Sequence, residues 1–135
     1  MLRTMLLGKI HRATITQCDP DYIGSITIDA DLLEAAGMLP NERVLVADLD
    51  NAVRFETYII LGERGSGIIG VNGAAAHTVA VGQKVIIMSF GQFENVGLEE
   101  HEARVVVADE RNHIAQTLSY PSSLSGKPQA VESGS

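Results

Sequence analysis

Three short groups of residues have types and spacings that could do chemistry. In the first group, Gly24 and Ser25 stand side by side within "DYIGSITID", which otherwise has the β-branched character of a strand. A glycine weakens the interior of a strand and marks a turn, a bulge or the close approach of another group to the backbone. From these residues alone, a plain turn is the simplest interpretation.

The second group lies in the strand-like segment "RFETYII", residues 54–60. Because side chains alternate between the two faces of a strand, Arg54, Glu56 and Tyr58 are predicted to share one face. Arg54 and Tyr58 would lie about 13 Å apart, so one could bind a carboxylate while the other transfers a proton. A solvated strand face is the plainer alternative, and the residues alone favour it.

The third group is the basic start of the chain, where Arg3, Lys9 and Arg12 accompany His11 without an acidic residue. Inside a pocket, Lys9 would be a compact charge that binds anions, although a surface lysine is the commoner case. His11 and His77 could exchange protons, but an isolated histidine more often makes one structural hydrogen bond.

The segment "VNGAAAH", residues 71–77, combines a turn asparagine with three alanines, whose small side chains could let backbone N–H groups approach a ligand. Its spacing alone predicts a turn that leads into a short helix. No His, Cys and carboxylate residues cluster at metal-ligand spacing in the sequence, and no Gly-rich phosphate loop is present. We therefore expect neither a metal nor a nucleotide.

Composition limits the class of protein. The 135 residues carry a formal net charge of −7 and are 45% hydrophobic, which suits one globular domain with a proper core. The negative charge argues against nucleic acid as a partner. No run approaches the roughly 18 apolar residues of a membrane span, so we expect a cytoplasmic protein that does not bind membranes. The single cysteine, Cys18, is expected to be a structural thiol.

The elements that must position these residues are mostly strands. Short β-branched runs bounded by turn residues predict strands over 13–16, 25–28, 43–49, 54–61, 67–71, 84–90 and 103–109. So many short strands in a small domain favour a barrel or a sandwich.

One helix is predicted at "DADLLEAAG", residues 29–37. Asp31 and Glu34 have the spacing of a capping box, and Gly37 suits the position after the last helical turn. Residues 118–135 are rich in Ser, Pro and Gly, a composition typical of disorder. We therefore expect a single domain over residues 1–117 and a disordered C-terminal tail.

Five segments resemble, in order and spacing, the bacterial aspartate 1-decarboxylases, which are pyruvoyl-dependent lyases that make β-alanine for pantothenate and coenzyme A synthesis. They are "MLRTMLLGKIHRATIT", "YIGSITIDADLL", "RFETY", "ERGSG" and "VNGAAAH". The resemblance implies a carboxy-lyase that converts L-aspartate to β-alanine and CO₂. It also implies a mainly β fold, a six-stranded double-psi β-barrel with short helices, assembled as a homotetramer with active sites between subunits.

The resemblance further implies a zymogen that cleaves itself between Gly24 and Ser25, giving a β-chain 1–24 and an α-chain from residue 25. Ser25 becomes a covalently bound pyruvoyl cofactor that forms a Schiff base with the substrate, without a metal or PLP. Gly24 lacks a Cβ that would resist a bent backbone. Thr57 matches the residue that stabilises negative charge on the Gly24 carbonyl oxygen. The resemblance leaves a maturation factor open as a partner.

Further roles come from matching positions in the family. Lys9 and Arg54 match the residues that bind the substrate carboxylates, with Thr57 in the same pocket, and Tyr58 matches the proposed proton donor. Asn72 resembles a residue that orients the pyruvoyl group. The pocket would also be lined by Gly73, Ala74 and Ala75.

His11 and Tyr22 match positions close to the cleavage site in relatives, where they could support it. At Ala47 this sequence departs from relatives that carry tryptophan, which alters the expected pocket wall. Two alternatives stay open. One is a double-psi barrel that binds ligands or partners and never cleaves itself, because a fold does not fix a function. The other is a serine hydrolase that uses Ser25, although the sequence defines no base for it.

Overall fold

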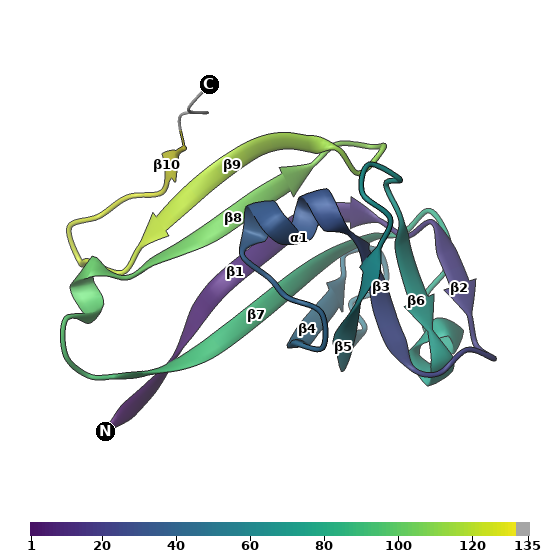
Figure 1. Ribbon diagram of the computed structural model, residues 1–135, viewed down its shortest axis with the longest axis horizontal. Coiled ribbons are helices and arrows are strands. Elements are labelled where there is room, and N and C mark those ends of the chain that lie inside the picture. Colours follow the sequence, from purple (N-terminus) through teal and green to yellow (C-terminus); the bar gives the residue numbers. More distant parts are fainter. Residues whose placement is uncertain (132–135) are drawn as a thin grey trace.

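The computed structural model describes residues 1–131 and is mainly β, as predicted (Figure 1). Its strands are β1 (Leu2–Thr14), β2 (Gln17–Asp19), β3 (Ser25–Asp29), β4 (Arg43–Asp48), β5 (Arg54–Gly62), β6 (Ile69–Asn72), β7 (Lys84–Glu94), β8 (Glu102–Ala108), β9 (Ile114–Pro121) and β10 (Gln129–Ala130). The helices are α1 (Ala30–Ala36) and the 3-10 helices η1 (Gly73–His77) and η2 (Leu98–Glu100). Within this part of the chain, no helix is long and apolar enough to cross a membrane.

All of these strands belong to one sheet, in the order β10-β9-β8-β1-β7-β4-β5-β3-β6-β2. Most neighbours are antiparallel, but β1 pairs with β8, β3 with β5, and β2 with β6 in parallel. The chain that leaves β1 reaches β6 directly, because Thr16 N donates to the Ile69 carbonyl oxygen at 2.9 Å. The sheet therefore curls until β6 lies beside the end of β1 (Figure 1).

Alternating β-branched side chains fill the space inside this curved sheet. Ile10, Ile87 and Val46 stand opposite one another in neighbouring strands and are fully buried. Ile26 and Ile59 form a similar pair between β3 and β5. Positions one residue away along these strands face outward, which places Lys9 and His11 of β1 and Tyr58 of β5 on the outer face of the sheet.

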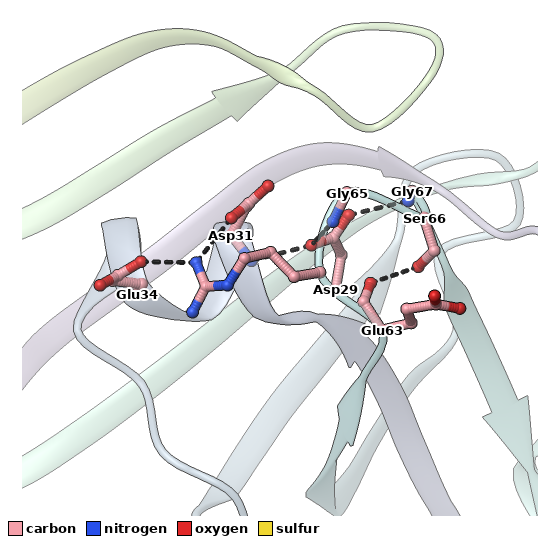
Figure 2. A network of polar contacts seen from close by, with 8 residues as sticks. Asp29, Asp31, Glu34, Glu63, Gly65, Ser66 and Gly67 are labelled. Carbon is pink, nitrogen blue, oxygen red and sulfur yellow. Dashed lines mark hydrogen bonds and ion pairs between the residues drawn. The ribbon is translucent and has the colours of Figure 1, made fainter.

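Helix α1 begins differently from the capping-box prediction, which was wrong (Figure 2). Asp29 is the N-cap residue, and its side chain accepts from Asp31 N at 2.8 Å. Asp31 and Glu34 instead both accept from Arg64 Nη1 at 2.7 Å, because that side chain reaches them from the loop between β5 and β6. The predicted end of the helix is confirmed, since Gly37 has a left-handed φ of 71°.

The C-terminal segment differs from the disordered tail expected over residues 118–135. Strand β9 pairs with β8 as far as Pro121, and β10 returns to pair with β9. Val131 N also donates to the Thr117 carbonyl oxygen at 2.8 Å. Composition does not predict these strands, because backbone hydrogen bonds to β8 and β9 hold them in place and such bonds do not require apolar side chains. Residues 132–135 of the same expectation lie outside the described residues.

Candidate active site

Ser25 is the first residue of β3 and is 1% exposed, whereas the preceding Gly24 is exposed. Ser25 Oγ donates to the Ile23 carbonyl oxygen at 3.2 Å and accepts from Asn72 Nδ2 at 2.9 Å. The amide reaches it because Ser25 and Asn72 are directly opposite in the antiparallel β3–β6 ladder. Asn72 Nδ2 also donates to Thr27 Oγ1 at 3.2 Å. The serine hydroxyl is therefore held between two neutral groups.

The backbone of Gly24 lies tightly against Gly73, the first residue of η1. Gly73 has a φ of 72°, and a Cβ on it would lie 2.5 Å from Gly24 Cα and 2.8 Å from Gly24 N. A Cβ on Gly24 would meet nothing within 4 Å, and its φ is outside the left-handed region. Sequence reasoning expected the residue without a Cβ to be needed at Gly24. In the structure it is needed at Gly73 instead.

Tyr58 lies on the strand next to Ser25. Strands β3 and β5 are parallel, with Ile26 opposite Ile59. One residue earlier in both strands, Ser25 and Tyr58 are level with each other on the opposite face, about 4.8 Å apart in backbone spacing. Tyr58 is 37% exposed, and the burial of β5 alternates as predicted, with Arg54 on the same exposed face.

A hollow of about 350 Å³ opens beside Tyr58 and is lined by Arg43, Glu56, Thr57 and Tyr58. Arg43 is opposite Tyr58 in the β4–β5 ladder, and its Nε lies 3.9 Å from Glu56 Oε2. Both charged side chains are mostly exposed, so this ion pair adds little stability. The hollow has the volume for a small molecule beside the phenol.

The two predicted carboxylate-binding cations do not converge on Ser25 within one chain. Arg54 precedes Tyr58 by four residues, which is about 13 Å along β5. Lys9 is level with Glu56 but separated from it by β7 and β4, three strand spacings or about 14 Å. Both cations occupy the outer face of the sheet, on the strands that flank β7 and β4.

His11 shares a row across the sheet with Ala47 and Arg54. Its Nδ1 is buried and, among the described residues, has no hydrogen-bond partner. Burial, together with the charges of Lys9 and Arg12, lowers the pKa of His11. The imidazole is therefore kept neutral near pH 7. Ala47 is 8% exposed, so neighbouring groups cover the small side chain that stands where relatives carry tryptophan.

The predicted short helix after Asn72 is present as η1. Ala74 is exposed and Ala75 is half-buried, while His77 is exposed at the end of the helix. Tyr22 is 51% exposed, and its carbonyl oxygen is part of the backbone that faces Gly73. The structure thus brings the loop before Ser25 and the start of η1 together.

Ser25 and Asn72, joined by a side-chain hydrogen bond, form what we call the serine cluster. Sequence reasoning missed two groups that contact it. Thr27 could have been found, because it lies two residues after Ser25 on the same face of the strand. The Ile23 carbonyl leaves no signal in the sequence.

Cys18 is half-buried with Sγ 3.9 Å from the Val79 carbonyl oxygen, and burial raises the pKa of its thiol. Over residues 1–131, no three His, Cys, Asp or Glu side chains are grouped to hold a metal ion.

Comparison with known proteins adds to this geometry. The family model described as aspartate decarboxylase matches residues 1–115. The chain belongs to the aspartate decarboxylase family. Relatives named aspartate 1-decarboxylase from Listeria welshimeri, Listeria monocytogenes and Listeria innocua are each 56% identical over 118 residues, which is 87% of this chain and 93% of the relative. The match to the family covers the serine cluster, the β5 face and the basic start of β1.

Proposed function

We propose that this member of the aspartate decarboxylase family removes the α-carboxylate of L-aspartate as CO₂ and leaves β-alanine for pantothenate and coenzyme A synthesis. The observation that carries the proposal is the buried Ser25 hydroxyl, hydrogen-bonded to Asn72 and placed directly after the exposed Gly24. The substrate is supported by the names of relatives that are 56% identical.

Ser25 is the proposed precursor of a pyruvoyl cofactor. Its Oγ attacks the carbonyl carbon of Gly24, and the amide between the two residues becomes an ester as the proton moves from oxygen to nitrogen. β-Elimination then releases Gly24 as a carboxylate and leaves dehydroalanine at residue 25. Water hydrolyses that group, ammonia leaves, and a ketone remains. The products are a chain of residues 1–24 and a chain that begins with the pyruvoyl group.

The surroundings of Ser25 fit such a small planar group. Asn72 Nδ2 donates to Ser25 Oγ before cleavage and is placed to donate to a carbonyl oxygen at residue 25 afterwards. Gly73 has no Cβ to occupy the space beside Gly24. When formed, a pyruvoyl group supplies an electron sink for the electron pair that a departing carboxylate leaves behind. The work of binding, orienting and protonating the substrate then falls to side chains of this family member.

Tyr58 is the proposed proton donor, because its phenol lies on the strand beside Ser25 and borders the hollow of about 350 Å³. Thr57 lines the same hollow and is the proposed stabiliser of the Gly24 oxyanion during cleavage. Lys9 and Arg54 are proposed to bind the two substrate carboxylates. The guanidinium of Arg54 suits bidentate binding of one of them.

Because Lys9 and Arg54 lie far from Ser25 in one chain, we propose that the site is completed between subunits of a homotetramer. A closed six-stranded double-psi barrel is the proposed core of each subunit. The strand order β1-β7-β4-β5-β3-β6 supports this closure, because its two end strands meet. The chain continues from β1 into β2 beside β6, and Thr16 N donates a hydrogen bond to the Ile69 carbonyl oxygen.

Mass spectrometry of the denatured protein tests the proposal. The wild-type chain is expected to give two pieces divided after Gly24, and Ser25→Ala is expected to stay whole and make no β-alanine, because it lacks the attacking oxygen. The control is Ser89→Ala, which removes a fully buried hydroxyl that has no partner among the described residues and should leave cleavage intact.

Normal turnover by Ser25→Ala would refute the cofactor. A wild-type chain that stays unbroken, both when purified and in an extract of its native host that could supply a maturation factor, would instead support a barrel that binds ligands without processing. A serine hydrolase would show an unbroken wild-type chain and loss of ester hydrolysis in Ser25→Ala.

A further inference from the structure

An aromatic side chain from beyond the family match lies against Lys9. Tyr120 belongs to β9, five residues past residue 115, where that match ends. Lys9 Nζ is 5.7 Å from the centroid of the Tyr120 ring. At distances up to about 6 Å, an ammonium group is attracted to the electron-rich face of an aromatic ring.

The strand register accounts for this contact. Lys9 is opposite Val105 in the parallel β1–β8 ladder, and Tyr120 is opposite Ala103 in the antiparallel β8–β9 ladder. Val105 and Ala103 are two residues apart on β8, so all four side chains share one face of the sheet. Strands β1 and β9 are about 9.6 Å apart, a gap that the lysine stem and the tyrosine ring span together above the small Ala103.

The environment makes the ring the principal partner of this ammonium. Lys9 and Tyr120 are both half-buried. The ion pairs found in the described part of the chain involve Arg43 and Arg64, and none involves Lys9. A lysine without a carboxylate partner keeps its charge available for an anion that arrives from solution.

We propose that Tyr120 is a positioning residue that holds the Lys9 ammonium in place for the substrate carboxylate. The inference rests on the substrate-binding role proposed above for Lys9. A flexible lysine loses side-chain freedom when it binds an anion, and a lysine already held by the ring loses less. The ring engages one side of the ammonium group and leaves N–H donors free on the other side.

The kinetic test compares Tyr120→Leu with Tyr120→Phe in the processed, full-length protein. Leucine keeps apolar bulk but removes the aromatic face, and phenylalanine keeps that face without the hydroxyl. Tyr120→Leu is expected to raise KM for L-aspartate by about two- to fivefold with kcat unchanged, which is the size of a half-exposed cation–π contact. Tyr120→Phe should retain the wild-type KM.

A second measurement follows the contact without using activity. The chain has three lysines, Lys9, Lys84 and Lys127, so the ε-methylene NMR signals are few, and Lys9→Arg identifies the one that belongs to Lys9. The ring current should move that signal upfield in the wild type and in Tyr120→Phe. In Tyr120→Leu it should return to the position of an exposed lysine.

The two measurements separate the possible failures. An unshifted Lys9 signal in the wild type, with normal aspartate decarboxylation, would overturn the positioning role and leave the proposed function standing. A shift lost in Tyr120→Leu with KM unchanged would also overturn it, because the contact would then not affect substrate binding. A shifted signal in a processed protein that does not decarboxylate aspartate would contradict the proposed function, and with it the substrate-binding part of this inference.

Discussion

At the scale of single residues, the partners of Ser25 Oγ decide what this hydroxyl can attack. It donates to the Ile23 carbonyl and accepts from the Asn72 amide, and neither group can act as a general base. A serine hydrolase places an imidazole or another base at this oxygen. The Gly24 carbonyl carbon is adjacent along the chain, so proximity favours an internal reaction over attack on a second molecule.

The contact between Gly73 and Gly24 gives a prediction at this scale. Gly73→Ala would place a Cβ 2.5 Å from Gly24 Cα, so the loop before Ser25 must move and cleavage should slow at least tenfold. Gly82→Ala is the matched control, because Gly82 also has a positive φ, of 93°, but a Cβ there meets nothing within 4 Å. The measurement is the rate at which each variant splits, followed by denaturing electrophoresis.

Equal cleavage rates in the two glycine variants would show that the loop tolerates displacement.

The sequence alone predicts Ser25 and Asn72 as candidates through the segments that contain them. It does not predict that Gly73 touches Gly24, because that contact depends on the register of β3 against β6, across almost fifty residues of chain.

At the scale of elements, Asp29 joins the end of β3 to the start of α1 and to the loop between β5 and β6 (Figure 2). Its Oδ1 accepts from Asp31 N at 2.8 Å and from Gly65 N at 3.1 Å, and its Oδ2 accepts from Gly67 N at 2.7 Å. The residue is 1% exposed, so these backbone bonds replace water completely. The strand that begins with Ser25 is thereby fixed at its opposite end.

Asp29→Ala should lower the free energy of unfolding by about 2–3 kcal/mol, because it removes the N-cap and leaves buried N–H groups unpaired. Asp31→Ala, the control, should lower it by less than about 1 kcal/mol, because its partner Arg64 is exposed. Urea unfolding measures both values. A larger loss for Asp31→Ala than for Asp29→Ala would contradict the stabilising role assigned to the Asp29 cap.

The sequence could not separate these two aspartates. Both Asp29 and Asp31 lie just before an apolar run, and either is an acceptable N-cap by residue type. The loop residues Gly65 and Gly67 decide between them, and they are more than thirty residues away.

At the scale of the whole molecule, the outer face of the sheet carries apolar side chains among its charged ones. Phe90 is 44% exposed and Tyr58 is 37% exposed. Phe90 lies two residues after Met88 in β7, on the face that also bears Lys9. An interface between copies here would cover this apolar area and bring the cations of one chain near another chain.

Phe90→Glu should therefore reduce the proposed assembly of four 14.4-kDa chains to a smaller species and lower aspartate turnover at least tenfold. Light scattering after gel filtration measures the mass. Val96→Glu is the control, since Val96 is 84% exposed in the turn after β7. A wild-type protein of 14.4 kDa with full activity would contradict the assembly.

Composition and periodicity predicted a mainly β domain, because alternating β-branched runs reflect one buried face. They predicted only the end of β1, whose first residues, "LRTMLL", lack that alternation. They also missed β9, whose residues mix apolar and polar side chains without a β-branched run. The position of β1 depends on backbone pairing with β7, and that of β9 on pairing with β8. A local sequence pattern does not encode such pairing.

The central position of β1 has a consequence for a chain divided after Gly24. This strand lies between β7 and β8, with antiparallel pairing to one and parallel pairing to the other, and Ile10 is fully buried. A severed N-terminal peptide could leave only by giving up both sets of backbone bonds and exposing that isoleucine to water. The two pieces would copurify as one particle, held together as firmly as neighbouring strands in an unbroken polypeptide.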